Sequence, residues 1–492
     1  MPLFQPKPNQ AKQPLAKPSQ TKPTISNMSY TKITSALLVQ IIDAVGSSNV
    51  FTDEESLANY AHDETEDLKY YPEVVVKPLD TAAISALLKL CSENNVPVTP
   101  RGGGTGLSGA ALPVYGGVLL SMEKFKAIIE IDTENLQATV EPGVITEEFM
   151  NAVAEHGLLY PVDPSSKGSC FIGGNVAHCS GGPRVVKYGT IREYILNLEV
   201  VLPTGEVIWT GANTLKYSSG YNLTQLMIGS EGTLAVVTKI VTKLIPKPAQ
   251  SVLMLASFSE NEAACAAVSA IFRAGVTPSA LEFMERKGVA WVIEHDDIKF
   301  DLKDGVNAFL MIEFDGDDMD VMLNDCEKTN TVLEQFNCSE VLLADTAGQK
   351  EDLWRMRRTM AESVKSNSVY KEEDTVVPRA ALPKLINGIK EIGGRYGFES
   401  VCYGHAGDGN LHINIIKAGM SDEDWKDKLK DGIVEIFELT AALGGTISGE
   451  HGIGLVQKDF MSIKYSEVNL NLMRSIKKVF DPAGILNPGK IF

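Results

Sequence analysis

The spacing of apolar residues along the chain alternates between continuous runs and a helical repeat, and each spacing predicts a different element. Residues 74–76 and 118–120 are continuous apolar runs, which predict buried strands. Between them, apolar residues recur three or four positions apart, as on one face of a helix: Ile84, Leu87, Leu88 and Cys91. Asp80 or Thr81 can cap this helix. A short strand at 96–98 completes a strand–helix–strand unit.

The same patterns divide the chain into two regions on either side of Pro246-Lys247-Pro248. Before this linker the pattern predicts one α/β unit over residues 40–245, with strands at 128–131 and 138–140 and a helix at 147–156. After it, strands and helices alternate: strands at 252–255 and 308–312, helices at 261–274 and 319–336, and a charged helix at 351–365. This second region is typical of an antiparallel sheet covered by helices.

The first unit leads into a glycine-dense loop, Pro-Arg-Gly-Gly-Gly-Thr-Gly-Leu-Ser-Gly at residues 100–109. Glycine reaches positive φ readily, and successive N–H groups in such a loop can hold an anion such as a diphosphate. Arg101 adds a guanidinium, and Thr105 and Ser108 add hydroxyl donors. A flexible surface loop is the alternative, but the ordered flanks disfavour it. Pro113 follows where a Rossmann motif would open a helix, so a different nucleotide-binding fold is expected.

Residues 404–415, Gly-His-Ala-Gly-Asp-Gly-Asn-Leu-His-Ile-Asn-Ile, are the second chemically informative stretch. Apolar and polar residues alternate from Leu411 onward, so His412 and Asn414 project from the same face of a strand. His405 lies on the preceding glycine loop, and a later segment places Glu450 beside His451. Two imidazoles and a carboxylate suit a catalytic divalent metal, although a histidine pair alone is more often two unrelated residues.

Together these motifs resemble FAD-linked oxidases of the vanillyl-alcohol-oxidase and p-cresol-methylhydroxylase (PCMH) type. The resemblance extends from about residue 40 to Phe492 and is greatest to the D-2-hydroxyacid dehydrogenase branch, which includes glycolate oxidase flavoprotein subunits and D-lactate dehydrogenases. It implies an α+β fold with a two-lobed PCMH-type FAD-binding domain and an α+β cap domain with an antiparallel sheet. The expected division is a tail at 1–30, the FAD-binding domain at 31–248, the cap at 249–450, and a segment at 451–492 that returns to the FAD-binding domain.

The resemblance also implies which residues hold FAD. The expected set is Pro100, Arg101, Gly102, Gly103, Gly104, Thr105, Gly106, Ser108, Gly109, Pro164, Ser165, Gly173, Gly174, Asn175, Ala177, Gly181, Gly182, Tyr188, Gly189, Glu231, Gly232 and Asn487. Covalent members of the superfamily typically carry the attaching histidine in the first glycine loop, where this chain has Gly104-Thr105. FAD is therefore expected to bind non-covalently, and His178 and Cys179 are interpreted as packing residues.

For the reaction, the resemblance implies a divalent metal, zinc or manganese above all, held by His405, His412 and Glu450. Arg357, in a Leu-Trp-x-x-Arg pattern, would hold the substrate carboxylate in a bidentate pair. Asn414 would contact the substrate, and Lys371 would line the same pocket. His451 would be the base that accepts the hydroxyl proton while the α-hydrogen leaves as hydride to flavin N5.

The implied substrate is a small D-2-hydroxy acid, with D-lactate or glycolate favoured over D-2-hydroxyglutarate. Ala361 supports this preference, because the dicarboxylate branch tends to carry a polar residue there. The electron acceptor would be a partner redox protein, a cytochrome or a quinone, and either a homodimer or a subunit of a complex is compatible. Two alternatives remain: alkyl transfer of the ether-lipid synthase type, which the metal set disfavours, and a non-catalytic FAD-binding subunit of an oxidase complex.

Composition narrows the partners and the compartment. The formal charge of −18 disfavours nucleic acid, and no apolar run is long enough to span a bilayer. Seven scattered cysteines give no disulfide framework and no iron–sulfur motif, so the cytosol or an organelle matrix is expected, with peripheral membrane association left open. Residues 1–30, rich in Pro, Lys and Gln, are expected to be a disordered tail, with a targeting segment or a start at Met28 as the alternatives.

Overall fold

The computed structural model describes residues 29–65, 67–296, 298–344 and 346–492. Residues 31–492 form one compact unit, to which the following description applies. The expectations for the N-terminal tail fall on residues 1–28 and so lie outside the described residues. None of the described helices combines the length and the apolar character needed to cross a membrane.

A four-stranded sheet presents the glycine loop. Its strands, in spatial order, are β1 (Val50–Phe51), β2 (Val74–Val76), β4 (Val118–Ser121) and β3 (Val98–Arg101). Helix α3 (Thr81–Asn94) connects β2 to β3, and both strands run parallel to β4. The Asp80 side chain caps α3 by accepting the N–H of Ala83, and the predicted apolar stripe is buried. The glycine loop therefore begins at the end of β3, a strand that the sheet holds rigidly.

A second sheet of five antiparallel strands forms the other lobe of the FAD-binding domain. Its strands, in order, are β5 (Ile128–Asp132), β6 (Gln137–Val140), β10 (Val236–Lys243), β8 (Ile195–Val201) and β9 (Val207–Trp209). Helices α4 (Thr146–Ala154) and α5 (Ile172–His178) contribute Phe149 and Val176 to a shared core with this sheet. The short strands β7 (Leu158–Leu159) and β11 (Ile245–Pro246) pair with each other.

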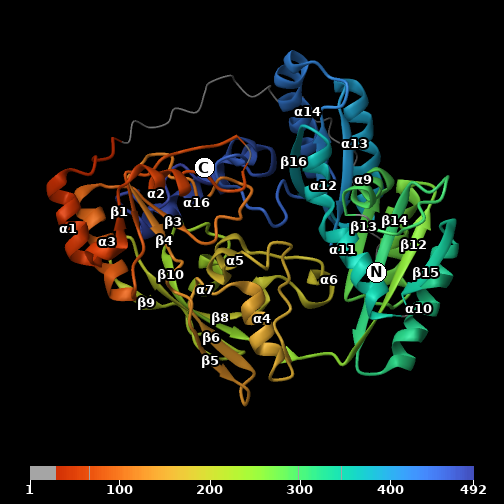
Figure 1. Cartoon of the computed structure of the whole chain (residues 1–492), viewed down its shortest axis with the longest axis horizontal. Helices are drawn as coiled ribbons and strands as arrows, with labels where there is room; N and C mark the ends of the chain where they lie inside the picture. The colour runs from red at the N-terminus through yellow and green to blue at the C-terminus, as the bar shows by residue number, and fades with distance from the viewer. Residues whose placement is uncertain (1–28, 66, 297, 345) are drawn as a thin grey trace, which may run out of the picture. The chain divides into compact units, whose positions relative to one another are not determined.

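The cap is built on a seven-stranded sheet in which every pairing is antiparallel. Its order is β15 (Cys338–Ala344), β12 (Gln250–Phe258), β14 (Ala308–Gly316), β13 (Ala280–Glu285), β17 (Glu399–Gly404), β18 (Asn410–Ile416) and β16 (Tyr370–Val376). Figure 1 shows β12, β13 and β14 side by side. The strands at the β16 edge, β17, β18 and β16, carry Tyr403, His412 and Glu372.

Helices cover both faces of this sheet. Val252 and Met254 of β12 belong to a core with α8 (Asn261–Arg273), α10 (Met319–Glu334), α13 (Leu382–Tyr396) and α14 (Asp422–Ala442). Leu253 and Leu255, which alternate with them, belong to a second core with α9 (Arg286–Asp296), α11 (Ala347–Arg358) and α12 (Met360–Asn367). The α+β fold and the helix-covered antiparallel sheet are therefore confirmed.

Two predicted elements differ from the structure. The strand expected at 96–98 starts only at Val98 and runs to Arg101, because its pairing with β4 continues to Ser121. The single helix expected at 351–365 is wrong: α11 ends before Thr359, and α12 begins after it. The Thr359 hydroxyl donates to the Arg355 carbonyl, a local bond of the kind that competes with helix propagation.

The last helix, α16 (Glu467–Phe480), is followed by a segment that contacts the FAD-binding domain. Val98 N–H donates to the Ile485 carbonyl, and Asn487 N–H donates to the Val98 carbonyl. The Asn487 amide donates to the carbonyls of Ala110 and Glu231, and the Lys490 ammonium donates to the Leu112 carbonyl. These contacts fix the segment that follows the glycine loop.

Candidate active site

A cavity of about 220 Å³, partly open to solvent, lies between the glycine loop and the cap sheet; we call it the main cavity. Residues 102–107 line one side, and side chains of α11, α12 and the β16 edge line the other. A second space of about 90 Å³, the adjoining cavity, shares Gly102, Ala110, Ala111, Gly174 and His178 with it.

The glycine loop presents unpaired donors to the main cavity. The backbone N–H groups of residues 103–106 form no hydrogen bond with any described residue. The Arg101 guanidinium lies beneath the loop, donates to the His62 carbonyl at 2.7 Å and faces the Tyr60 ring. Gly104 has φ +75°, and a Cβ there would lie 2.2 Å from the Arg101 side chain. This loop is a preformed anion cradle that only glycine permits at position 104.

Helix α5 forms the wall that faces the glycine loop. A Cβ at Gly174 would meet no protein atom within 4 Å, and one at Gly102 would lie 3.6 Å from the Gly174 Cα. The two backbones therefore approach closely at Gly102, while Gly174 leaves an open slot on its other side, which Gly173, Ala177 and Gly232 continue into the adjoining cavity. A slot beside an anion cradle fits a flat ring system joined to a diphosphate, as in FAD.

On the cap side, His405, His412 and Glu450 converge on one point. The Nε2 atoms of His405 and His412 lie 3.4 and 3.6 Å from the same Glu450 oxygen, Oε1. The possible ligand atoms of the three residues all lie within 4.8 Å of one another. Both histidines are buried. Two imidazole nitrogens and a carboxylate aimed at a cavity fit an open divalent-metal site.

Glu282 of β13 orients two side chains of this site. Its carboxylate lies 2.9 Å from His405 Nδ1 and accepts the Arg357 Nε–H at 2.7 Å. Burial would raise the pKa of Glu282, but the charges of His405 and Arg357 outweigh it and keep the pKa below its ordinary value. Burial would lower the pKa of His405, but Glu282 and Glu450 raise it well above its ordinary value, so without a metal both ring nitrogens carry protons. Because Glu282 accepts the hydrogen bond from Nδ1–H, Nε2 is the nitrogen that would lose its proton to bind a metal beside Glu450.

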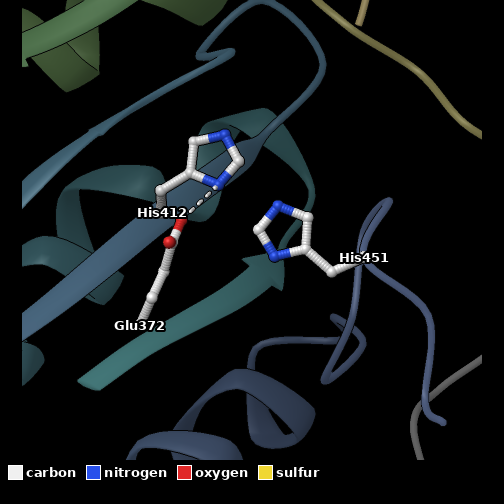
Figure 2. A group of neighbouring side chains, drawn as sticks. All are labelled: Glu372, His412 and His451. Atoms are coloured by element: carbon white, nitrogen blue, oxygen red, sulfur yellow. Dashed lines mark ion pairs between the residues drawn. The ribbon is translucent and has the colours of Figure 1, made fainter. Parts of the chain in front are cut away.

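A second group, Glu372, His412 and His451, borders the first (Figure 2). His412 Nδ1 lies 3.6 Å from Glu372 and 3.8 Å from Asp374, and the His451 ring lies nearly parallel to the His412 ring at 5.3 Å. The carboxylates favour a proton on His412 Nδ1, which leaves Nε2 free for Glu450 and a metal. We therefore interpret Glu372 and Asp374 as the orienting shell of His412.

Burial and these carboxylates set the charge of each group. Burial lowers the pKa of His412 to about 3, so the ring is neutral, as a metal ligand must be. Burial would lower the pKa of His451, but Asp374, Glu372 and Glu450 raise it above its ordinary value. Burial would raise the pKa of Glu450, but the His405 hydrogen bond and charge lower it to about 2.

Several buried polar atoms around the main cavity have no hydrogen-bond partner among the described residues. They are Arg357 Nη2, Tyr403 OH, His412 Nδ1, and both amide atoms of Asn414. Arg357 also lies over the Tyr403 ring, 5.0 Å from its centroid. Buried polar groups are nearly always paired in native proteins, so such a cluster indicates a site that a polar ligand completes.

Comparison with known proteins identifies the family. Residues 72–211 match the family model described as "FAD binding domain", and residues 247–491 match "FAD linked oxidases, C-terminal domain". A glycolate oxidase subunit GlcD of Bacillus subtilis is 38% identical over 94% of this chain and 97% of its own length. The chain belongs to the FAD-linked oxidases.

Two further comparisons agree with this FAD-linked oxidase family. A D-lactate dehydrogenase of Anaerostipes hadrus is 36% identical over 95% of this chain and 99% of its own. The solved structure of p-cresol methylhydroxylase with substrate bound superposes with a TM-score of 0.77, at 19% identity, over 93% of this chain and 96% of the other. The PCMH-type fold predicted from the sequence is thus confirmed, and the chain is an FAD-linked oxidoreductase.

Most of the expected FAD residues of this oxidase line the two cavities. They are Pro100, Arg101, Gly102, Gly103, Gly104, Thr105, Gly106, Pro164, Ser165, Gly173, Gly174, Asn175, Ala177, Glu231 and Gly232. Seven others line neither: Ser108, Gly109, Gly181, Gly182, Tyr188, Gly189 and Asn487. The Tyr188 hydroxyl donates instead to Asp315 of the cap, and Gly109 N–H donates to Thr65.

The residues expected to take part in the oxidase reaction lie at the main cavity or directly behind it, except Lys371. Arg357, His412, Glu450 and His451 line the main cavity, with His405 and Asn414 buried behind them. Lys371 alternates with Glu372 along β16 and lines a smaller neighbouring space with His451 instead. His178, interpreted from the sequence as a packing residue, lines both cavities, whereas Cys179 packs against the core of its lobe.

Sequence reasoning missed three contributors to the oxidase site: Glu282, Glu372 and Tyr403. Each lies on a cap strand next to a predicted site residue, so strand pairing brings it there and no local motif marks it. An acidic residue at the third position of an otherwise apolar run, Ala-Leu-Glu-Phe-Met, was the available signal for Glu282.

Proposed function

We propose that the chain oxidises a small D-2-hydroxy acid to the 2-oxo acid, with D-lactate or glycolate as the favoured substrates. One observation carries the proposal. Of the thirteen buried side-chain polar atoms that lack a hydrogen-bond partner among the described residues, four belong to Arg357, Tyr403 and Asn414. A 2-hydroxy acid offers the matching groups, a carboxylate and a neighbouring hydroxyl, and is small enough for the space beside the flavin slot.

FAD, when bound, supplies the two-electron acceptor. A divalent cation held by His405, His412 and Glu450 would supply positive charge at the substrate hydroxyl, with zinc or manganese as the favoured ions. Arg357 holds the substrate carboxylate through Nη2, because Glu282 already occupies its Nε–H. Asn414 contacts the hydroxyl or carboxylate oxygens. His451 accepts the hydroxyl proton, and Asp374, Glu372 and Glu450, which outweigh burial and raise its pKa, stabilise the imidazolium that forms.

The length of the substrate depends on the wall formed by α11 and α12. Ala361 lines this wall with an apolar methyl group, which favours the short chain of lactate or glycolate. Arg358 lines it too, half-exposed and 3.8 Å from Asp163. Because a second guanidinium could hold a second carboxylate, D-2-hydroxyglutarate is the alternative substrate that Arg358 supports.

The reduced flavin needs an acceptor outside the chain, and we propose a partner redox protein, a cytochrome or a quinone. The name of the GlcD relative, a glycolate oxidase subunit, supports a role within a complex. The seven cysteines are all free, consistent with the proposed cytosolic or matrix location.

Anaerobic flavin reduction tests the proposal. Purified holoenzyme is mixed with D-lactate, glycolate or D-2-hydroxyglutarate, and bleaching of the flavin is followed with and without a chelator. We expect one of these acids to bleach the flavin and the chelator to abolish the bleaching. R357K should raise KM for that acid about 100-fold, because lysine lacks the planar guanidinium. R355K is the matched control, since Arg355 is exposed and pairs with Asp352 in the same helix. If none of the acids bleaches the flavin of the metal-loaded protein, the chain is a non-catalytic FAD-binding subunit.

A further inference from the structure

Side chains accept the backbone N–H groups of the loop that carries Glu450 and His451. Asp374 Oδ2 accepts three successive backbone N–H groups, those of residues 449, 450 and 451, at 2.7, 2.8 and 3.1 Å. The next N–H, of Gly452, donates to Ser448 Oγ at 3.0 Å. Glu231 then accepts the N–H of Ile453 on Oε1 and that of Gly454 on Oε2, both at 2.7 Å. Six consecutive N–H groups thus have side-chain acceptors.

The two carboxylates come from different domains. Asp374 lies on β16 at the edge of the cap sheet, and Glu231 lies between α7 (Leu223–Met227) and β10 in the FAD-binding domain. The residues are 3% and 5% exposed, so neither carboxylate is a solvated surface charge. His178, from the same domain as Glu231, adds a 3.0 Å contact between its Nδ1 and the His451 carbonyl. The loop therefore spans the two domains as a strap that both hold.

A buried amide side chain fixes each of these two acidic residues, at the carboxylate of Asp374 and at the backbone of Glu231. Asn410 Nδ2 donates to Asp374 Oδ1 at 2.6 Å, which leaves Oδ2 for the loop. Asn487 Nδ2 donates to the Glu231 carbonyl at 2.7 Å and holds the Glu231 backbone at φ +51°. A non-glycine residue in this left-handed region is uncommon and often marks a functional constraint. The conformation directs both Glu231 oxygens to the loop.

We propose that Asp374 and Glu231 are positioning residues that hold Glu450 and His451 at the reacting centre from both sides. The proposal rests on the proposed function of His451 and Glu450, which both lie on the strap. A displacement of about 1 Å of a reacting group can cost about a hundredfold in rate, so a strap fixed at both ends is a means of preorganisation. For Glu231 this replaces a direct role in FAD binding, because backbone N–H groups occupy both carboxylate oxygens.

E231Q, D374N and S448A, each as FAD-loaded holoenzyme, test the proposal by two readouts. The first is amide hydrogen exchange of the peptide covering residues 449–454, which needs no substrate. Each variant removes at least one acceptor, and we expect about tenfold faster exchange there. The second is steady-state kinetics per bound flavin: kcat should fall about 10- to 100-fold, with KM and FAD content unchanged.

E199Q is the matched control. Glu199 is also a buried carboxylate of the FAD-binding domain, but it accepts bonds from Thr81, Thr238 and Lys239 and does not touch the strap. It should leave exchange at 449–454 as in the wild type. S448A makes the mildest change and keeps the test decisive if D374N does not fold.

Two outcomes would overturn the proposal. One is unchanged exchange at 449–454 in E231Q and S448A. The other is an E231Q protein that loses FAD while kcat per remaining flavin stays at the wild-type value, since Glu231 would then be a cofactor residue. A wild-type protein that oxidises no 2-hydroxy acid would refute the proposed function instead, and the exchange data would still decide whether the strap exists.

Discussion

At the scale of single residues, Glu282 joins two functions that the sequence presents as separate. It is fully buried, lines no part of the main cavity, and contacts both His405 and Arg357. One carboxylate therefore orients a proposed metal ligand and the arginine proposed to bind the substrate. A glutamine in its place has one acceptor oxygen for two donors, so one of the two side chains must lose its partner.

E282Q should weaken the binding of both the cation and the substrate. We expect cation affinity to fall about 10- to 100-fold, the usual effect of removing a carboxylate behind a metal-binding histidine. KM for the 2-hydroxy acid should rise because Arg357 loses its fixed orientation. Competition with a chromogenic chelator measures the first effect, and steady-state kinetics at saturating metal measures the second.

E285Q provides the comparison for this prediction. Glu285 lies on the same strand, is also buried, and binds Lys390, Asn261 and the Cys402 N–H away from the site. Equal losses of cation affinity in E282Q and E285Q would mean that the strand, and not the carboxylate contact, is responsible.

Lys490 gives the chain a pH-dependent stability. Its ammonium is buried and donates to the Leu112 carbonyl, and burial lowers its pKa to about 7 although Glu231 opposes the shift. Between pH 7 and its ordinary pKa near 10.5, the unfolded chain binds the proton and the folded chain does not. Stability therefore rises with pH across this window, and below pH 7 the cost of burying the charge is constant.

K490M should remove this slope. Relative to K490M, the wild type should gain about 3 kcal/mol of unfolding free energy between pH 7 and pH 9.5, at about 1.4 kcal/mol per pH unit. Urea titrations of both proteins at the two pH values measure the difference. A difference that does not change with pH would show that Lys490 stays protonated in the folded protein.

At the scale of elements, the sequence predicted best where one pattern had one physical cause. The stripe from Ile84 to Cys91 and the Asp80 cap fixed α3, and alternation from Leu411 fixed β18 and put His412 and Asn414 on one face. Prediction from the sequence failed where a local hydrogen bond competed with the helix, as at Thr359. It also failed where the pairing of distant strands decided which residues lie next to each other. Glu282 meets His405 across the chain, at a separation of 123 residues, which no local pattern encodes.

Helix α5 allows a test that separates the fold from the cofactor. Alanine at Gly174 meets no protein atom and favours the helix, so G174A should stabilise the FAD-free protein by about 0.5–1 kcal/mol. The added methyl group projects into the slot, so FAD affinity should fall. Thermal unfolding without FAD and a fluorescence titration with FAD measure the two effects.

G104A should behave in the opposite way. Its Cβ would strike the Arg101 guanidinium at a backbone φ of +75°, so the loop itself is strained and the FAD-free protein is destabilised. If G174A bound FAD as tightly as the wild type, the slot beside Gly174 would not be the flavin site.

At the scale of the whole molecule, Asp315 links the cap to the FAD-binding domain. It lies on β14, and its side chain is 3% exposed. From the other domain, Arg184 Nη1 donates to it at 3.2 Å, Tyr188 donates at 2.9 Å, and the Lys187 ammonium bonds both its carboxylate and its carbonyl. Arg184 directly precedes α6 (Val185–Tyr188), and Tyr188, which sequence reasoning assigned to the cofactor, ends it. This contact joins the two domains whose residues line the main cavity, the glycine loop from one and Arg357 from the other.

D315N should loosen the two domains while leaving each one folded. Asparagine keeps the shape but removes the carboxylate partner of Lys187 and one of the three that surround Arg184, and we expect a loss of about 2 kcal/mol after discounting for their exposure. The calorimetric transition should broaden or split, and KM should rise while flavin content stays at one per chain. D317N, an exposed aspartate two residues on, is the control. A single unchanged transition in D315N would show that other contacts hold the domains together, and the rise in KM would then be absent as well.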